Sequence, residues 1–456
     1  MNSEDGNAES HGRGRELIDR VIHRTRAGVV TPDVRGGDTK RTAEARHAEF
    51  VSLAAAIDLD LRFDQVMRVR EVKPATYLGG GQVEQLVEQA KTEDIELLLV
   101  DASLSPIQQR NLERAVGVKV LDRTGLILEI FGERAATREG VLQVDLAHLN
   151  YQKGRLVRSW THLERQRGGG GFLGGPGETQ IESDRRQIQD RIVLLEKRLE
   201  KVRRTRRLQR GPRESVPFPV VALVGYTNAG KSSIFNAMTG SGVMAQDLLF
   251  ATLDTTVRKT RLPHGRDVVM SDTVGFISDL PTDLVAAFRG TLEEVIDASV
   301  ILHVRDISNP DHSAQASDVL SVLNDLGVSG ETTPIIEVWN KIDRLPPDAE
   351  ESGRGLSSVR AVGRVETTVA VSALTSEGLP QLFDAIEKCL ARDSRRFYVL
   401  VPHSASSDTG WLYEHTEVLE RREPDEKGTS FVVRVLPRNR SEFLDRFAGR
   451  INAIEG

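Results

Sequence analysis

The sequence predicts a multidomain α/β protein that ends in a small α+β domain. Its 456 residues suit two to four domains, and its 39% hydrophobic content is enough to fill their cores. In two separate stretches, short apolar runs alternate with helical patterns, which is typical of parallel sheets covered by helices. A long basic segment with helical periodicity lies between those two stretches.

Composition excludes several classes of protein. The single cysteine, Cys389, excludes an internal disulfide framework and a cysteine-rich zinc site. No stretch approaches the roughly 18 uninterrupted apolar residues of a membrane helix, and the N-terminus lacks the apolar core of a secretion signal. A net charge of −6 and 28% charged residues are ordinary for a cytosolic protein. We expect the chain to be cytoplasmic, without a membrane span, and monomeric in solution.

The N-terminal α/β domain is predicted over residues 44–140. The residues before it, 1–43, are polar, charged and glycine-rich, and we expect them to form a disordered tail. Nothing in this domain has the pattern of a metal site or of a nucleophile. Apolar runs predict strands at 66–72, 96–101 and 118–122, and amphipathic patterns predict helices at 80–94 and 105–116.

Residues 141–213 are predicted to form a basic helical hairpin with a glycine-rich tip. Apolar residues recur along 141–163 and along 181–202 in steps of three, four and seven, so each helix carries one seam that the other can bury. Between the helices lies GGGGFLGGPGETQ (168–180), whose seven glycines allow close approach to another backbone.

The hairpin is also strongly basic. Residues 151–213 contain 17 Lys/Arg against 7 Asp/Glu, a net charge of +10. Such an excess in an acidic protein indicates a polyanionic partner. A solvated helix face laced with salt bridges is the alternative, and composition alone does not decide between them.

A second α/β pattern, over residues 217–392, begins with a strand, a loop and a helix. The loop fits G-x-x-x-x-G-K-[ST], in which backbone amides and a helix N-terminus surround phosphates. Lys231 would neutralise the β- and γ-phosphates, and the Ser232 hydroxyl would ligate Mg²⁺; a chance match in an ordinary turn is the alternative. The loop residues are Gly225, Tyr226, Thr227, Asn228, Ala229, Gly230, Lys231 and Ser232.

Three further motifs, DTVG, NKID and VSAL, follow later strands of the same pattern. They comprise Asp272, Thr273, Val274 and Gly275; Asn340, Lys341, Ile342 and Asp343; and Ser372, Ala373 and Leu374. Asp272 would hold the metal directly or through water, and the Gly275 amide would meet the γ-phosphate. Asp343 can accept from the guanine N1–H and N2–H₂, a donor pair that adenine lacks, and the Ala373 amide can meet the guanine oxygen. Order and spacing therefore predict a P-loop GTPase domain that binds GTP or GDP with Mg²⁺ and hydrolyses GTP.

The segment 248–262 must supply a threonine that senses the γ-phosphate through Mg²⁺. Four candidates exist: Thr252, Thr255, Thr256 and Thr260. Thr260 falls on the next predicted strand, and Thr255 and Thr256 are better placed to cap or start that strand.

Phe276 follows DTVG, where many GTPases place a glutamine that orients the attacking water. Phenylalanine cannot do this, so the catalytic group is unknown: another residue positions the water, or a bound partner supplies the missing group. We predict slow basal hydrolysis that docking accelerates, and Phe276 can at the same time pack into the core of the second switch.

Residues 396–456 are predicted to form the small C-terminal α+β domain. We expect strands at 397–402 and 430–437, a helix around 411–420 and a final helical turn.

The chain resembles the HflX family of ribosome-associated GTPases. The resemblance covers roughly residues 45–392 and is carried by PATYLGGGQVE, LSPIQQRNLE, DRTGLILEIFGERAATREGVLQVDLAHLNY, GGPGETQIESDRR, LFATLD and DTVGFISDLPTDLVAAFRGTLEEV. It implies that Thr252, within FATLD, reaches Mg²⁺ together with Ser232. The neighbours implied to bind the nucleotide are Phe250, Ala251, Leu253 and Asp254.

The resemblance also implies a partner and a function. Members bind the large ribosomal subunit and, with GTP, split or rescue stalled or hibernating ribosomes; their arm reaches rRNA near the peptidyl-transferase region. A GTP-gated assembly or occupancy factor of the large subunit, without splitting activity, is the alternative. A signalling GTPase with a protein effector is a third hypothesis, and the charge of the arm argues against it. The candidate rRNA contacts are Arg165, Arg167, Gly170, Phe172 and Gly175.

Overall fold

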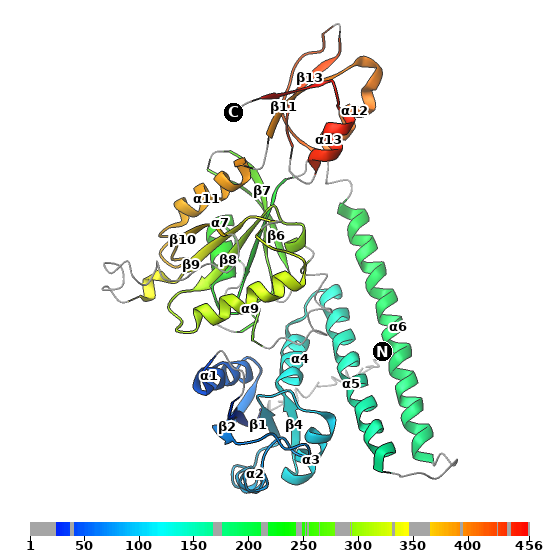
Figure 1. Ribbon diagram of the computed structural model, residues 1–456, viewed down its shortest axis with the longest axis vertical. Coiled ribbons are helices and arrows are strands. Elements are labelled where there is room, and N and C mark those ends of the chain that lie inside the picture. Colours follow the sequence, from blue (N-terminus) through cyan, green and yellow to red (C-terminus); the bar gives the residue numbers. More distant parts are fainter. Residues whose placement is uncertain are drawn as a thin grey trace, which may run out of the picture.

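In the residues that it describes, the computed structural model contains three sheets and a pair of long helices (Figure 1). The N-terminal sheet lies at one end of the molecule, the largest sheet in the middle and the C-terminal sheet at the other end. The described residues are 24–36, 41–166, 176–210, 218–242, 249–250, 252, 255–263, 265–278, 292, 294–330, 333–345, 365–392, 395–425, 427–435 and 439–454.

The N-terminal sheet has four parallel strands in the order β2-β1-β3-β4. Its elements are β1 (Thr25–Val34), α1 (Ala43–Ala54), β2 (Leu59–Val69), α2 (Gly80–Thr92), β3 (Leu97–Val100), α3 (Pro106–Val116), β4 (Lys119–Asp122) and α4 (Arg123–Arg134). Helix α3 begins at the predicted position because the Ser105 hydroxyl accepts from the Gln108 amide at 3.2 Å, which caps the helix.

The prediction of a disordered tail before residue 44 is wrong for residues 25–34. They form β1, which lies between β2 and β3 and is buried over most of its length. The strand was hard to predict because Gly28 and Pro32 interrupt a short apolar run. Gly28 is required by the packing, since a Cβ there would lie 2.3 Å from the Phe63 ring. The first 23 residues lie outside the described part of the chain.

Helices α5 (Arg138–Gln166) and α6 (Pro176–Arg210) pack against each other as the predicted hairpin (Figure 1). Ile192 and Leu199 are buried along the predicted seam of α6. The residues that connect the two helices lie outside the described part. Neither helix, nor any other in the described residues, is apolar enough over a sufficient length to cross a membrane.

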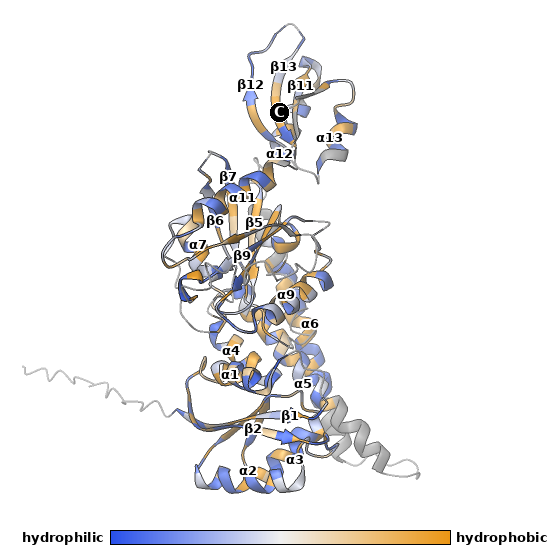
Figure 2. Cartoon of the chain, turned by 60° about the vertical axis from the view of Figure 1, so that its left-hand side comes forward, coloured by the Kyte–Doolittle hydropathy of each residue, from blue (hydrophilic) through white to orange (hydrophobic). Residues whose placement is uncertain are grey.

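The middle sheet has six strands in the order β10-β9-β8-β5-β7-β6, and only β6 is antiparallel to its neighbour. Its elements are β5 (Val220–Gly225), α7 (Lys231–Thr239), β6 (Thr256–Arg261), β7 (Asp267–Asp272), β8 (Val300–Asp306), α9 (His312–Asp325), β9 (Ile335–Asn340), the 3-10 turn η2 (Ile342–Arg344), β10 (Val365–Ala370) and α11 (Leu379–Arg392). Helices cover both faces, so β5, β8 and β9 are buried over almost their whole length. Figure 2 shows the hydrophobic residues of β5. The four sequence motifs follow the carboxyl ends of β5, β7, β9 and β10, and the parallel topology brings them to one edge.

The C-terminal sheet is antiparallel, with strand order β12-β13-β11-β14. Its elements are β11 (Arg395–Val401), the 3-10 turn η3 (His403–Ala405), α12 (Ser406–His415), β12 (Glu417–Arg421), β13 (Thr429–Val435), α13 (Arg440–Arg446) and β14 (Ile451–Ile454). The expected helix around 411–420 is wrong in its second half, because α12 ends at His415 and residues 417–421 pair with β13. An apolar core that includes Trp411, Phe431 and Phe443 holds the helices on the sheet.

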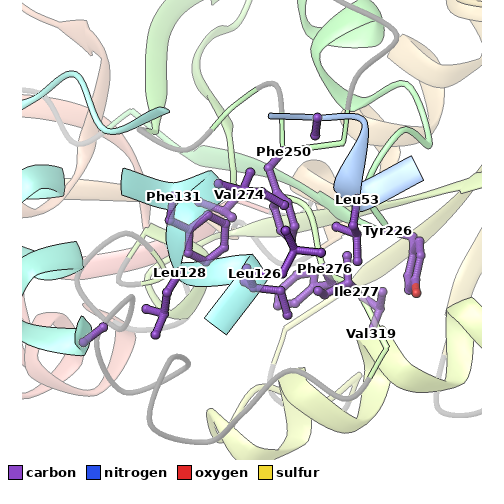
Figure 3. Close-up of a cluster of buried hydrophobic side chains, with 14 of the residues drawn as sticks. Leu53, Leu126, Leu128, Phe131, Tyr226, Phe250, Val274, Phe276, Ile277 and Val319 are labelled. Atoms are coloured by element: carbon purple, nitrogen blue, oxygen red, sulfur yellow. The ribbon is translucent and has the colours of Figure 1, made fainter. Parts of the chain in front are cut away.

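The N-terminal and middle sheets share one buried apolar cluster (Figure 3). Phe131 of α4 meets Phe250 of the middle domain edge to face, with ring centroids 4.6 Å apart and an interplanar angle of 81°. Leu53 of α1, together with Phe276 and Val319 of the middle domain, belongs to the same cluster. The two domains are therefore packed together through residues that lie next to the sequence motifs.

Candidate nucleotide-binding site

The phosphate loop connects the end of β5 to the start of α7, and its two glycines are needed there. Gly230 has a φ of +92°, and a Cβ at this position would lie 2.1 Å from Asn340 Nδ2. Gly225 has a φ of +155°, and a Cβ there would lie 2.2 Å from the Val304 carbonyl oxygen. Only glycine combines these backbone conformations with such close neighbours. Asn228, also left-handed at φ +59°, completes the turn.

Lys231 is buried at the N-terminus of α7 and points back into the loop. Its Nζ donates to the carbonyl oxygens of Gly225 at 3.2 Å and Tyr226 at 2.9 Å. Burial lowers the pKa of Lys231 to about 8, against the opposing effect of Asp272. An amine held by carbonyl groups beside a helix N-terminus is suited to bind a phosphate oxygen.

Three oxygen-bearing side chains meet beside this lysine. Ser232 Oγ lies 2.6 Å from Asp272 Oδ2 and 2.8 Å from Thr252 Oγ1, and Thr252 Oγ1 lies 3.2 Å from the same carboxylate oxygen. Asp272 Oδ1 is buried without a hydrogen-bond partner among the described residues. Burial raises the pKa of Asp272, although Lys231 and the two hydroxyls oppose that shift. The donor set is all oxygen, which fits a hard cation such as Mg²⁺.

This geometry distinguishes Thr252 from the other candidate threonines. Thr256 is the first residue of β6, and the Thr260 hydroxyl donates to the Met238 carbonyl oxygen at 3.3 Å. Thr255 directly precedes β6. Of these four residues, Thr252 is the one whose hydroxyl contacts both Ser232 and Asp272.

The NKID and VSAL motifs form the opposite side of the site. Asn340 Nδ2 donates to the Ala229 carbonyl oxygen at 2.8 Å, and its Oδ1 accepts from the Ala373 amide at 3.1 Å. The Ser372 hydroxyl donates to Asp343 Oδ1 at 2.6 Å, which orients that carboxylate. Asn340 therefore joins the phosphate loop to both motifs, a structural role that the sequence argument did not assign to it.

The remaining residues of these motifs have different environments. Lys341 adopts a left-handed φ of +66°, and its Nζ lies 2.8 Å from Asp306 Oδ2. The Thr273 hydroxyl donates to the Leu223 carbonyl oxygen at 2.6 Å. Leu374 is 84% exposed and lies at the rim. Val274 is buried, and Ile342 starts the turn η2.

Phe276 is 4% exposed and packs in the cluster shared with the N-terminal domain, which confirms its predicted packing role. Sequence reasoning missed the polar residues beside it: Ser278, and Arg41 and Glu49 of the N-terminal domain, contact the Tyr226 hydroxyl. No local pattern could have indicated them, because Tyr226 and Glu49 are 177 positions apart in the chain.

Several predicted site residues lie outside the described part of the chain. They are Ala251, Leu253, Asp254, Arg167, Gly170, Phe172 and Gly175. Arg165 lies within α5, but its side chain is not among those described.

Four family models match consecutive parts of the chain. Their descriptions are GTP-binding GTPase N-terminal (residues 44–132), GTP-binding GTPase middle region (134–213), 50S ribosome-binding GTPase (220–341) and HflX C-terminal domain (358–455).

Two relatives and a solved structure are among the proteins similar to the chain. The GTPase HflX of Magnetococcus marinus is 50% identical over 392 residues, which cover 85% of this chain and 88% of that protein. The GTPase HflX of Escherichia coli is 41% identical over 361 residues, which cover 78% and 81%. The crystal structure of a GTP-binding protein from Sulfolobus solfataricus in complex with GDP is 22% identical, with a TM-score of 0.42, and covers 81% of this chain and 99% of that one.

Proposed function

Because the chain belongs to the HflX family of GTP hydrolases, we propose that it binds the large ribosomal subunit and uses GTP to split or rescue stalled or hibernating ribosomes. The main support for this proposal is the basic hairpin formed by helices α5 and α6. The same chain contains a domain that matches a 50S ribosome-binding GTPase model. The net charge of +10 over residues 151–213 suits the phosphates of rRNA. Because its proposed partner is the ribosome, we place the protein in the cytoplasm. We also propose that it acts as a monomer.

The phosphate loop and the three later motifs bind GTP and GDP in this proposal. The loop amides and Lys231 hold the phosphates, and the Gly275 amide meets the γ-phosphate. Asp343, oriented by Ser372, accepts from the guanine N1–H and N2–H₂. The Ala373 amide, which donates to Asn340 Oδ1 in this structure, would donate to the guanine oxygen in its place when the base binds.

Ser232 and Thr252 would hold Mg²⁺, with Asp272 binding it directly or through water. When bound, the ion neutralises charge that develops on the phosphate oxygens. Both hydroxyls lie within 3.2 Å of Asp272 Oδ2, so the fold places the three groups that would hold the ion next to one another.

Hydrolysis is proposed to be slow in the free protein. The side chain of Phe276 is apolar and buried, so it cannot orient the attacking water. A group supplied by the ribosome, or by another residue that docking places, completes the site. Turnover with and without large subunits tests this point, and high turnover in their absence would contradict it.

The ribosomal part is tested by sedimentation. Intact ribosomes are mixed with the protein and GTP, and the particles are separated on a sucrose gradient; we expect free small and large subunits. Co-migration of the protein with undissociated ribosomes or with precursor large subunits would instead favour an assembly or occupancy role. Absence of any association with ribosomal particles would contradict both.

Two variants make this experiment specific. Lys231→Ala should lose nucleotide binding and with it the splitting activity. A chain without residues 168–177 should keep nucleotide binding in solution and lose splitting, because the candidate rRNA contacts at the tip are removed. Splitting by that deletion variant at the normal rate would show that the tip is not needed.

A further inference from the structure

Glu49 of the N-terminal domain contacts two segments of the GTPase site. Its Oε1 accepts from the Ser278 hydroxyl at 2.7 Å, and its Oε2 accepts from the Tyr226 hydroxyl. Tyr226 is the second residue of the phosphate loop, and Ser278 lies three residues after Gly275 of DTVG. The Ser278 amide also donates to the Tyr226 hydroxyl at 2.6 Å. One carboxylate from another domain therefore joins the phosphate loop to the second switch.

The carboxylate of Glu49 is charged and held firmly. Its side chain is 12% exposed and pairs with Arg123 and with Arg41, the latter at 2.8 Å. Burial by itself would raise the pKa of Glu49, but Arg123, the two hydroxyl donors and Arg41 outweigh it and hold the pKa below its ordinary value. Arg41 continues the contact into the GTPase domain, at 2.7 Å from Asp318. The N-terminal domain thus presents to the site a carboxylate that two arginines hold in place.

The second switch lies directly on the phosphate loop. The Phe276 amide donates to the Gly225 carbonyl oxygen at 3.1 Å, and the Thr227 amide donates to the Phe276 carbonyl oxygen at 2.7 Å. A Cβ at Gly275 would lie 2.7 Å from Thr227 Cγ2 and 3.1 Å from Lys231 Nζ. Even a methyl group does not fit there. A γ-phosphate would contact both Lys231 and the Gly275 amide, so it would bind where this segment packs most closely against the loop.

We propose that Glu49 is a positioning residue that sets the preference of the GTPase site between GDP and GTP. By holding Ser278 and Tyr226 together, it stabilises the arrangement in which Gly275 lies against Lys231. A diphosphate is compatible with this arrangement, and a triphosphate has to displace it. Movement of the N-terminal domain that breaks the Glu49 contacts therefore favours GTP. This inference rests on the nucleotide-binding roles proposed above and needs no ribosome.

The test measures dissociation constants of fluorescent GDP and of a fluorescent non-hydrolysable GTP analogue for the free, full-length protein. Glu49→Gln and Ser278→Ala should each shift the ratio of the two constants toward the GTP analogue by about tenfold, the value of a hydrogen bond to a charged group. Ser278→Thr, which keeps the hydroxyl, should leave the ratio within about twofold of the wild-type ratio. Glu44→Gln, at an exposed position on the same helix as Glu49, is the matched control. It should also leave the ratio of the two dissociation constants within about twofold of the wild-type ratio.

An unchanged ratio in both Glu49→Gln and Ser278→Ala overturns the inference. General destabilisation would weaken both nucleotides together, so a parallel loss also counts against it. Glu49→Gln could fail to fold because Arg41 and Arg123 lose their counter-charge. In that case the result for Ser278→Ala tests the inference, since this variant leaves both ion pairs in place. Failure of the wild-type protein to bind either nucleotide is a separate result, which overturns the proposed nucleotide site and this inference with it.

Discussion

Replacing Gly230 by alanine should damage the site through one identifiable contact. The left-handed φ of +92° at this residue costs an L-amino acid about 1–2 kcal/mol. The new Cβ would lie 2.1 Å from Asn340 Nδ2, so the Asn340 side chain must move and lose its bond to the Ala229 carbonyl oxygen. Leaving these buried groups unpaired costs about 1–3 kcal/mol more. We therefore expect Gly230→Ala to lower the free energy of unfolding by about 2–5 kcal/mol.

Gly240 provides the matched control for this prediction. It too has a left-handed φ, +65°, but no atom lies within 4 Å of a Cβ built there. Gly240→Ala should cost only the backbone term of about 1–2 kcal/mol and leave GDP affinity unchanged. Urea unfolding and GDP titration of both variants measure the difference. Equal losses of stability in the two variants, or normal GDP affinity in Gly230→Ala, would refute the role given to the contact with Asn340.

Three further predictions concern single side chains. Neither ring nitrogen of His303 has a partner among the described residues, and burial, with a smaller effect of Arg305, lowers its pKa to about 3. This histidine becomes protonated near pH 6.5 in the unfolded chain but not in the folded chain. Lowering the pH from about 7.5 to about 5.5 should therefore reduce the free energy of unfolding by about 1.4 kcal/mol more in the wild type than in His303→Leu. Urea unfolding measures this, and an equal change of unfolding free energy with pH in both proteins would contradict it. Asp343→Asn should weaken the preference for guanine over other purines in competition titrations, and unchanged selectivity would refute its role. Thr252→Ala should reduce the Mg²⁺ dependence of binding of a GTP analogue while sparing that of GDP; equal Mg²⁺ dependence in variant and wild type would exclude Thr252 as a ligand.

The local parts of the site were predictable from sequence. The loop from Gly225 to Ser232 and the motifs at Asp272 and Asn340 are short strings whose residue types follow from the chemistry of phosphate and guanine. Their convergence follows from parallel strands, whose carboxyl ends share one edge. The local pattern alone could not select Thr252, because four threonines lie close together in sequence. The family resemblance selected it, and in the structure its contact with Ser232 distinguishes it from the others.

The parts that sequence did not predict depend on contacts between distant segments. Strand β1 was assigned to a tail because its own apolar run is short, and its burial comes from β2 and β3 on either side. The polar cluster around Glu49 joins residues that are 177 and 229 positions apart. A single charged residue on a helix gives no sign of such a partner, because an exposed glutamate such as Glu44 has the same local pattern.

The most direct test of the central claim is co-sedimentation of the full-length protein with purified large ribosomal subunits under three conditions: with a non-hydrolysable GTP analogue, with GDP, and without nucleotide. We predict that the protein sediments with the subunits when the analogue is bound and remains in the supernatant in the other two conditions. Equal association in all three conditions would contradict the claim that the nucleotide in the GTPase domain controls how the basic arm binds rRNA.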